Sequence, residues 1–294
     1  MPPLTVGSTT FHWGRQTYLM GILNLTPDSF SGDGLIKEGG DWIAAAVAQA
    51  QAQVAEGAHI LDVGGESTRP GSRPTSAEEE LRRVLPVIRA LASGANAVNV
   101  PISIDTYKAE VARQAVAAGA SIVNDVWGLR MDPDVARVVA GANAALILMH
   151  NRSKPKDAVQ EAQLGGRYVG VAYKDLLGDI IHELRESVEM ALAAGVPPEK
   201  IIVDPGIGFG KTVEQNLELL DRLGELKALG HPILAGPSRK SFVGYTLNLP
   251  PDQRLEGTAA AVALAIDRGA DIVRVHDVAA MTRVARFTDA VVRR

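Results

Sequence analysis

Short apolar runs alternate with longer amphipathic stretches along most of the chain. The short runs are rich in Ile, Val and Leu and lack apolar–polar alternation, which is typical of strands buried on both faces. The predicted strands are Tyr18–Asn24, His59–Val63, Pro101–Asp105, Ser121–Asp125, Ala145–His150, Ile201–Asp204, Pro232–Gly236 and Asp271–His276. The predicted helices are Trp42–Glu56, Ala77–Leu91, Ala109–Ala118, Pro133–Ala140, Tyr173–Ala194, Val213–Leu229, Arg254–Arg268 and Val278–Val291.

This order of elements indicates the class of fold. Eight strand–helix units in succession predict an α/β protein, a TIM (β/α)₈ barrel, built as a single domain over residues 1–294. A doubly wound open sheet is the alternative that the pattern leaves open. Ser76 and Glu79 have the spacing of a capping box before the second helix. We found no linker or low-complexity block that would divide the chain.

Polar residues occur where the apolar strands end. These strand-end residues are Asn24, Asp62, Glu66, Asp105, Asn124, Asp125, His150, Asp204, Ser238, Arg239, Lys240, Ser241, Arg274 and His276. The carboxyl ends of parallel strands meet at one mouth of a barrel, where TIM-barrel chemistry takes place. Any single residue of this kind could simply cap the following helix, but the whole set favours an active site.

The last predicted strand carries two cationic or polar side chains. Arg274 and His276 share one face, because strand side chains alternate, and Val275 lies on the other. A guanidinium beside an imidazole suits an anion such as phosphate. The alternative is a salt bridge to a neighbouring acid, such as Asp271 or Asp277.

A glycine-rich segment, DPGIGFGKT, starts at Asp204. It resembles a phosphate-binding loop, but Pro205 stands where the first glycine belongs. It also resembles a dinucleotide fingerprint, but Lys211 stands at the third glycine position. We therefore reject both and expect the glycines to let the backbone approach a flat ligand beside Asp204.

Three further segments are predicted to be loops. GILNLTPDSFSGDG, from Gly21, and GGESTRPG, from Gly64, contain several Gly, Pro and polar residues. They could be ordinary surface loops, or they could fold over a substrate and exclude water. Residues 151–170 read as a long polar loop after the fifth strand.

Composition narrows the class of protein. The 294 residues are 46% hydrophobic and 22% charged, with a net charge of −4 and no cysteine. This excludes disulfides and thiolate metal sites, and it gives no basic footprint for nucleic acid or a membrane surface. We expect no signal peptide and no membrane-spanning helix, and hence a cytoplasmic protein.

The motifs taken together resemble the dihydropteroate synthase family of pterin-binding enzymes. The matching segments are GILNLTPDSF, DVGGESTRPG, SIDT, IVNDV, DPGIGFGK, GPSRKSFVG, RLEGT and VRVHDV. They occur in one order, about one per barrel unit, over about nine-tenths of the chain. The resemblance implies a TIM barrel that joins a dihydropterin pyrophosphate to p-aminobenzoate in folate biosynthesis, and a target of sulfonamides.

The resemblance also implies site residues. The pterin would be bound by Asp105, Asn124, Asp204 and Lys240, with Asp105, Lys240 and Arg274 as the catalytic set. Pyrophosphate would be bound by Asn24, Thr68, Arg69, Arg274 and His276. The p-aminobenzoate pocket would be formed by Thr26, Pro27, Phe30, Pro70, Phe209, Lys240 and Ser241, with the substrate carboxylate at the helix that begins near Ser241.

Asn24 would be the protein ligand of a Mg²⁺ cofactor that also binds phosphate oxygens. The family is understood to follow an SN1-like path in which pyrophosphate leaves first and Asp105 stabilises the pterin cation. The partners implied are these small-molecule substrates and a second copy in a homodimer, without nucleic acid or membrane.

The sequence departs from the family pattern in two places. Its usual Ser-Asp-Gly-Gly after Phe30 is here Ser31-Gly32-Asp33-Gly34, and the run after His150 is Asn151-Arg152-Ser153-Lys154-Pro155. Two rival functions remain: a pterin-binding methyltransferase domain that serves a corrinoid protein, and a non-catalytic pterin-binding paralogue. The methyltransferase would not need the TPDSF and STRP loops, and the paralogue would be expected to lack residues such as Arg274.

Overall fold

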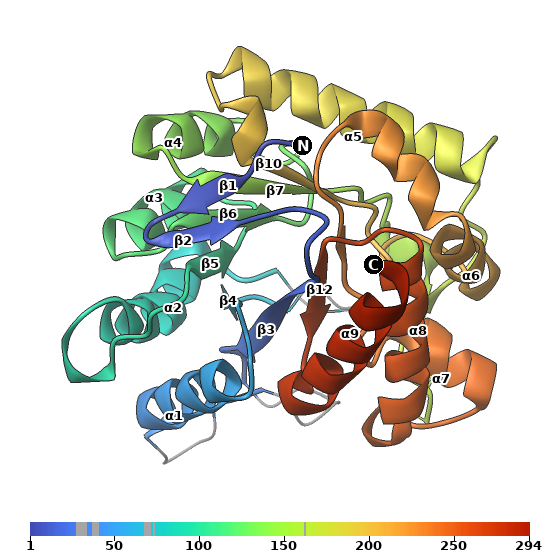
Figure 1. The fold of residues 1–294 in the computed structure, drawn as a ribbon, viewed down its shortest axis with the longest axis horizontal. Coiled ribbons are helices and arrows are strands. Elements are labelled where there is room, and N and C mark those ends of the chain that lie inside the picture. The colour runs from blue at the N-terminus through green and yellow to red at the C-terminus, as the bar shows by residue number, and fades with distance from the viewer. Residues whose placement is uncertain (28–33, 37–40, 68–71, 73, 162) are drawn as a thin grey trace.

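A computed structural model describes residues 1–27, 34–36, 41–67, 72, 74–161 and 163–294. The described residues form an eight-stranded parallel sheet in the order β10-β7-β6-β5-β4-β3-β12-β11. A parallel bridge between Val203 and Ile233 joins the first and last strands of that order. The sheet therefore closes on itself, which confirms the barrel and excludes the open sheet (Figure 1). The barrel strands are β3 (Tyr18–Asn24), β4 (Ile60–Gly64), β5 (Ile102–Asp105), β6 (Ile122–Asp125), β7 (Ala145–Met149), β10 (Ile201–Asp204), β11 (Leu234–Ala235) and β12 (Ile272–Val275).

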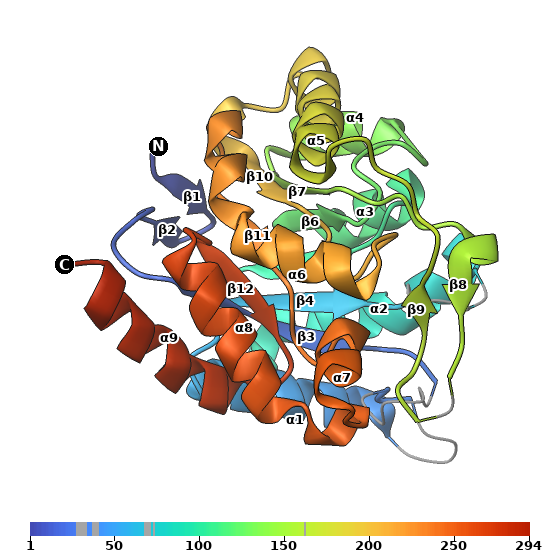
Figure 2. The same cartoon turned by 90° about the vertical axis from the view of Figure 1, so that its right-hand side faces the viewer.

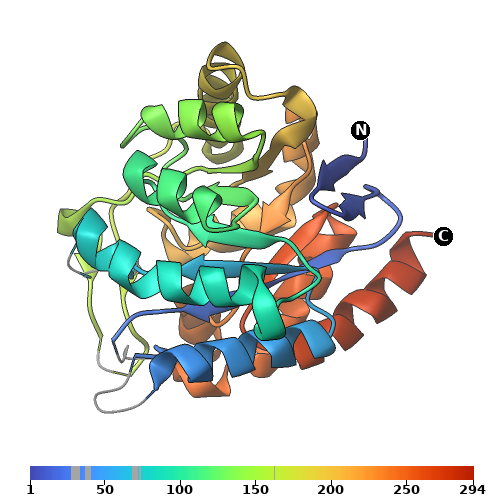
Figure 3. The same ribbon diagram turned by 90° about the vertical axis from the view of Figure 1, so that its left-hand side faces the viewer.

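Nine α-helices were identified in the described chain, and most of them match the predicted ranges to within a few residues. They are α1 (Trp42–Ala55), α2 (Ala77–Ala92), α3 (Ala109–Ala117), α4 (Asp134–Ala142), α5 (Leu176–Ala193), α6 (Val213–Asp221), α7 (Ser241–Leu247), α8 (Leu255–Asp267) and α9 (Val278–Val292). Figure 3 shows the helices of the first half of the chain, blue to green, side by side outside the sheet.

Two predicted helical features need correction. The predicted helix Val213–Leu229 ends at Asp221 and continues as a 3-10 helix, Leu223–Leu229, in which Gly224 lies against the backbone of Arg268. Ser76 does cap α2 by accepting from Glu79 N at 3.2 Å. The Glu79 carboxylate instead pairs with Arg82 and Arg83, so the reciprocal half of a capping box is replaced by these ion pairs.

The strand side chains divide into two layers inside the barrel. Ile60, Ile122, Ile202 and Ile272 belong to one buried interior cluster. Two residues further along the same four strands stand Asp62, Asn124, Asp204 and Arg274. Because side chains repeat every two residues on a strand, these polar groups share the interior face, one layer closer to the mouth.

An antiparallel hairpin, which the sequence pattern did not predict, closes the N-terminal end of the barrel. Its strands are β1 (Leu4–Val6) and β2 (Thr9–Phe11). The Phe11 ring is fully buried and lies 4.8 Å from the Tyr18 ring in an edge contact, while Tyr18 OH accepts from His12 N at 2.7 Å. Figure 2 shows this hairpin on one side of the sheet and the carboxyl strand ends on the other.

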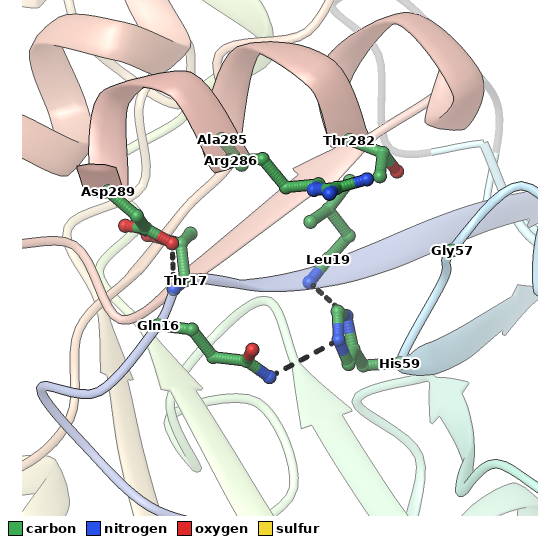
Figure 4. A pocket seen from close by; sticks show the side chains of 9 residues that line it. All are labelled: Gln16, Thr17, Leu19, Gly57, His59, Thr282, Ala285, Arg286 and Asp289. Atoms are coloured by element: carbon green, nitrogen blue, oxygen red, sulfur yellow. Dashed lines mark hydrogen bonds between the residues drawn. The ribbon is translucent and has the colours of Figure 1, made fainter.

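The same end of the barrel contains a small cavity of about 230 Å³ between β3, the turn before β4, and α9. Asp289 of α9 binds Thr17 there, accepting from its backbone N and its hydroxyl at 2.7 Å each (Figure 4). His59 Nδ1 accepts from Leu19 N at 3.1 Å. These contacts fix α9 to the start of β3, at the end of the barrel away from the mouth.

The long segment after β7 folds into a ribbon, β8 (Ala158–Val159) and β9 (Arg167–Tyr168). It lies at the mouth side of the barrel near α7 (Figure 2). Tyr245 OH of α7 lies 2.9 Å from Glu161 Oε2 and 3.1 Å from Gly165 O, and the Arg167 guanidinium stacks 4.5 Å from the Tyr245 ring. The predicted loop is thus an arm anchored to α7.

Candidate active site

The polar layer of the barrel is centred on Arg274. Its Nε donates to Asp62 Oδ2 at 2.6 Å, and its Nη2 donates to Asp105 Oδ2 at 2.9 Å. Asn124 Nδ2 also donates to Asp62 Oδ2, at 3.0 Å. Four strands therefore contribute one connected polar cluster. Arg274 is ion-paired as the alternative interpretation allowed, although its partners are Asp62 and Asp105 rather than Asp271 or Asp277.

The electrostatics of this cluster are set by burial. Burial raises the pKa of Asp105 to about 8; Arg274 opposes this shift, and the neighbouring Asp62 carboxylate adds to it. Asp62 and Asp105 share one guanidinium in a buried cluster, so Arg274 does not balance the charge of the cluster when Asp105 is ionised. Such a site favours a ligand that brings positive charge or hydrogen-bond donors.

Asp204 and Lys240 form the other half of the polar layer. Asp204 Oδ1 accepts from Gly206 N at 2.7 Å, and burial raises the pKa of Asp204 against the opposing charge of Lys240. Lys240 Nζ donates to Ile207 O and lies 4.5 Å from the centre of the Phe209 ring. Burial lowers the pKa of Lys240 to about 8, opposed by Asp204.

Glycine makes the approach of Lys240 possible. A β-carbon on Gly208, whose φ is +82°, would lie 2.7 Å from Lys240 Cδ. Any other residue at this position would push the lysine stem away as well as straining the backbone. The glycine-rich segment thus brings its backbone close to the Lys240 side chain, and the Lys240 amine lies over the Phe209 ring.

Lys211 has a structural place in this segment. It is 2% exposed, and its Nζ lies 3.0 Å from Gly206 O, 3.1 Å from Phe209 O and 3.0 Å from His150 Nδ1. Burial lowers the pKa of Lys211 well below its ordinary value, and these three acceptors oppose that shift by matching the three N–H groups of an ammonium. Lys211 therefore holds the glycine loop from inside, which agrees with rejecting a phosphate-binding loop.

His150 is directed away from the mouth. Its Nδ1 lies 3.0 Å from Lys211 Nζ, and accepting from that amine leaves the proton of a neutral ring on Nε2, which lies 3.1 Å from Glu183 Oε2. Burial and the charge of Lys211 lower the pKa of His150 to about 3, despite Glu183. His150 is thus a neutral link between the glycine loop and α5.

Other strand-end residues also have structural partners. Asp125 caps the turn after β6 by accepting from Trp127 N and Leu129 N at 2.8 Å each. Glu66 forms an ion pair with Lys108, which also binds Glu80. The interpretation as caps or ion pairs therefore holds for Asp125 and Glu66. The site itself is formed by the strand-end residues of the polar layer described above.

His276 lies beside Ser238 at the end of β12. Ser238 Oγ accepts from His276 N at 3.2 Å and lies 3.0 Å from His276 Nδ1. A hydroxyl that donates to Nδ1 leaves the proton of a neutral ring on Nε2. The arrangement fixes the ring of His276 through the turn that precedes Lys240.

The remaining predicted residues lie at the mouth or outside the described chain. Asn24 ends β3, where its carbonyl accepts from Leu35 N at 3.1 Å, and Thr26 O accepts from Ile36 N at 3.2 Å. Pro27 bridges to Ile36. Ser241 is the first residue of α7. The predicted Phe30, Asp33, Thr68, Arg69 and Pro70 lie outside the described residues.

Two residues without a specific predicted role lie centrally in the structure: Asp62, which is one of the strand-end candidates, and Lys211. Asp62 is fully buried and accepts from both Arg274 and Asn124. An acid in the middle of an otherwise apolar strand is the signal that could have selected it, because burial of an unpaired carboxylate is very costly. Lys211 was noted only for breaking a motif.

Family comparison identifies the chemistry that this geometry serves. The sequence pattern of the pterin binding enzymes matches residues 20–276. The dihydropteroate synthase of Clostridium beijerinckii is 48% identical over 292 residues, which cover 99% of this chain and 100% of the relative. The chain belongs to the dihydropteroate synthase family.

Solved structures of dihydropteroate synthases have the same fold. The Clostridium difficile enzyme, determined in the presence of pteroic acid, is 47% identical with a TM-score of 0.85 and covers 97% of this chain and 100% of its own. The Yersinia pestis enzyme, in a sulfonamide drug complex, is 38% identical with a TM-score of 0.88, covering 99% of both chains.

These relatives match this chain over almost its whole length, so the similarity to dihydropteroate synthases extends well beyond a shared pterin-binding core. This favours a synthase over the methyltransferase and non-catalytic alternatives. Within the described residues, no helix is both long and apolar enough to span a membrane.

Proposed function

We propose that this chain joins 6-hydroxymethyl-7,8-dihydropterin pyrophosphate to p-aminobenzoate, giving 7,8-dihydropteroate and pyrophosphate. The observation that carries the proposal is the polar layer deep in the barrel, where carboxylates, an amide, a lysine and an arginine stand on neighbouring strand ends. A flat heterocycle with donors on one edge and acceptors on another is the ligand that this layer suits.

The pterin would be recognised through its pyrimidine edge. That edge offers adjacent N–H donors, which a carboxylate accepts as a bidentate pair. Asp204 Oδ1 accepts from Gly206 N, which orients the carboxylate and leaves Oδ2 and the second lone pair of Oδ1 for the ligand. Asn124 would read the same edge, and Lys240 would exchange Ile207 O for the ring carbonyl and ring nitrogen.

The chemical step would be an SN1-like displacement. The bond between the pterin methylene carbon and the pyrophosphate oxygen breaks first, and its electron pair leaves with pyrophosphate. The amine of p-aminobenzoate then forms a bond to that carbon and loses a proton. Asp105, in its ionised form, would stabilise the cation delocalised into the ring. Burial raises the pKa of Asp105, and a positive charge developing beside it would favour its ionised form.

The leaving group would bind at the mouth. Arg274 is a cation of the pterin layer itself, and His276 follows two residues later, just after β12 ends at Val275. Thr68 and Arg69, which lie outside the described residues, are the further anion-site residues that the resemblance implies. Developing negative charge on the departing oxygen would then be met by guanidinium and imidazole donors.

Mg²⁺ would be held at Asn24. The amide oxygen of Asn24 is a hard ligand at the mouth, and no group of three His, Asp or Glu side chains suited to a metal occurs among the described residues. A site with one protein ligand fits a cation that keeps waters and takes most of its oxygens from phosphates. When bound, Mg²⁺ would neutralise charge on the pyrophosphate.

The p-aminobenzoate pocket would lie between the glycine loop and α7. Phe209 and the stem of Lys240 would hold the ring, and Ser241 would meet the carboxylate. Thr26 and Pro27, which follow β3, and also Phe30 and Pro70, are the further pocket residues that the resemblance implies. Because α7 has only seven residues, the Ser241 hydroxyl carries more of this contact than the helix dipole does.

Two broader properties belong to the same proposal. We infer a cytoplasmic enzyme, since its substrates are small water-soluble metabolites and the described residues include no membrane-spanning helix. We also infer a homodimer, in line with the family resemblance. Sedimentation velocity of the purified chain would measure its mass directly.

A turnover assay tests the function. The protein is incubated with the pterin pyrophosphate, Mg²⁺ and p-aminobenzoate, and dihydropteroate and pyrophosphate are both quantified. Equal amounts of the two products are expected. Methyl transfer to a corrinoid protein, or pterin binding without product, would support one of the two rival functions instead. Omission of Mg²⁺ in a parallel series tests the cofactor.

A further inference from the structure

Arg239, which precedes Lys240, has an unusual backbone. Its φ is +55°, in the left-handed region that residues with a β-carbon rarely adopt. Such a conformation persists where surrounding contacts over-determine it, and it tends to occur near functional sites. The next residue, Lys240, returns to an extended conformation and caps α7. The direction of the Lys240 side chain therefore depends on the turn at Arg239.

Two residues of the RLEGT segment hold this turn by its backbone. Thr258 Oγ1 accepts from Arg239 N at 3.0 Å, and Arg254 Nη1 donates to Arg239 O at 3.0 Å. Thr258 is fully buried and Arg254 is 3% exposed. Both backbone groups of the left-handed residue are thus bound to the start of α8. The Arg239 side chain adds a contact from Nε to Asp277 Oδ2 at 2.9 Å.

Arg254 also connects the turn to two other segments. Its Nε donates to Leu249 O at 3.0 Å, just after α7, and its Nη2 donates to Leu164 O at 2.9 Å, in the β8–β9 arm. The guanidinium packs on Gly244, where a β-carbon would lie 2.1 Å from Nη2. One planar side chain therefore joins the arm, the Lys240 turn and α7, which a lysine could not do with the same geometry.

We propose that Arg254 and Thr258 are positioning residues for Lys240. By holding Arg239 in the left-handed conformation, they set the direction in which the Lys240 amine enters the pterin layer. The arm after β7 takes part through the bond from Arg254 to Leu164 O. This inference rests on the proposed role of Lys240 in pterin binding, and neither positioning residue touches substrate in it.

The test uses the full-length protein and the substitution Thr258→Val, which removes the acceptor with little change of shape. Thr258→Ser restores the hydroxyl. Thr288→Val is the matched control, because Thr288 is also a mostly buried helical threonine, in α9, and its hydroxyl bonds only within that helix, to Val284 O. The measurements are kcat/KM for the pterin substrate against pH, the calorimetric Kd for the pterin, and the melting temperature.

Thr258→Val should lower kcat/KM by about tenfold or more and move the alkaline limb of its pH profile, since a displaced amine loses its specific surroundings. Thr258→Ser should recover most of the loss. Arg239→Gly introduced into Thr258→Val should also recover activity, because glycine adopts the left-handed conformation without support. A purely structural role would lower the melting temperature of Thr258→Val and Thr288→Val alike and leave the pH profile unchanged.

Equal kinetics for Thr258→Val and the wild type, or no recovery on adding Arg239→Gly, would overturn the proposal. Should Thr258→Val fail to fold, the same comparison is made with Arg254→Lys, alone and with Arg239→Gly. Absence of turnover in the wild type would count against the proposed function instead. In that case the pterin Kd of the same variants decides whether Arg254 and Thr258 position Lys240.

Discussion

The Arg274 guanidinium donates from Nε to the fully buried Asp62 carboxylate at 2.6 Å, across 212 positions of sequence. Arg274 therefore neutralises a buried carboxylate inside the barrel and also supplies a cation towards the mouth. The arginine that would meet the leaving pyrophosphate is therefore already oriented by a group behind it. Loss of either residue should have effects on both stability and activity.

Removal of Arg274 should destabilise the fold more than a typical surface arginine would. Arg274→Ala leaves the buried Asp62 charge uncompensated, which costs about 3–5 kcal/mol in such cases. Adding Asp62→Asn removes the stranded charge, so the double variant should regain much of the stability but stay inactive. Urea unfolding and turnover of the four proteins measure this. Additive losses of stability in the double variant would contradict the coupling.

The pH dependence of kcat/KM should be bell-shaped, with both limbs near pH 8. Asp105 has a raised pKa of about 8, so its ionised fraction increases as the pH rises through that value. Lys240 has a lowered pKa of about 8, so its protonated fraction decreases over the same range. If the reaction needs carboxylate and ammonium together, the rate falls on both sides. The residual activity of Asp105→Asn should lack the acid limb, and a flat wild-type profile from about pH 6 to 9 would contradict the assignment.

Acid should unfold the protein partly through His150. Its pKa is about 3 in the folded state against 6.5 when unfolded, so the unfolded state binds more protons below pH 6.5. The stability that comes from keeping it neutral is present above pH 6.5 and is lost as the pH falls towards 3. The loss should be about 1.4 kcal/mol per pH unit in that window. His150→Asn, which keeps an acceptor for Lys211, should show a shallower decline in urea-unfolding experiments from pH 6.5 to 4.

Pterin affinity should depend on the second oxygen of Asp204. In Asp204→Asn the amide oxygen can still accept from Gly206 N, so the glycine loop is expected to keep its shape. The amide N–H would then face the ligand donors, a mismatch of about 1–3 kcal/mol or more. Calorimetry should therefore show pterin binding weakened by roughly tenfold to a hundredfold or beyond, at a nearly unchanged melting temperature. Unchanged affinity would remove Asp204 from the pterin site.

Sulfonamides should compete with p-aminobenzoate and not with the pterin substrate. The drug resembles p-aminobenzoate in its aniline ring and polar end, and should lie against Phe209, the Lys240 stem and Ser241. It extends beyond the position of the carboxylate, so added bulk at the rim of the pocket should repel it more than the substrate. Inhibition series that vary each substrate in turn distinguish the cases. Competition only with the pterin would mean that the second pocket is wrongly placed.

The local sequence pattern was sufficient to predict the barrel strands and the polar residues at their carboxyl ends. Ile60 with Asp62, and Ile202 with Asp204, repeat an apolar residue and an acid at the strand spacing of two, which places both acids inside the barrel. The barrel mouth could be predicted because parallel strands bring their carboxyl ends together. The Tyr18–Asn24 and Ile201–Asp204 strands agree with the structure in both bounds.

The remaining features depend on contacts between distant segments. The local sequence does not show that Lys211 points back into its own loop or that His150 faces α5. Both side-chain directions depend on buried partners that are distant in the sequence. The β1–β2 hairpin is too short for a pattern of its own, since three-residue strands show little alternation. The arm after β7 is likewise stabilised by α7 and Arg254 rather than by its own sequence.

The β1–β2 hairpin closes one end of the barrel and leaves the mouth at the other. Because Phe11 and Tyr18 pack across the floor of the barrel, a molecule bound at the depth of Asp62 and Asp204 is expected to enter and leave through the mouth. Whatever sits above it, between Phe209 and α7, stands in that path. The pterin, at the deeper position, is therefore expected to bind first and p-aminobenzoate second, and the products are expected to leave in the reverse order.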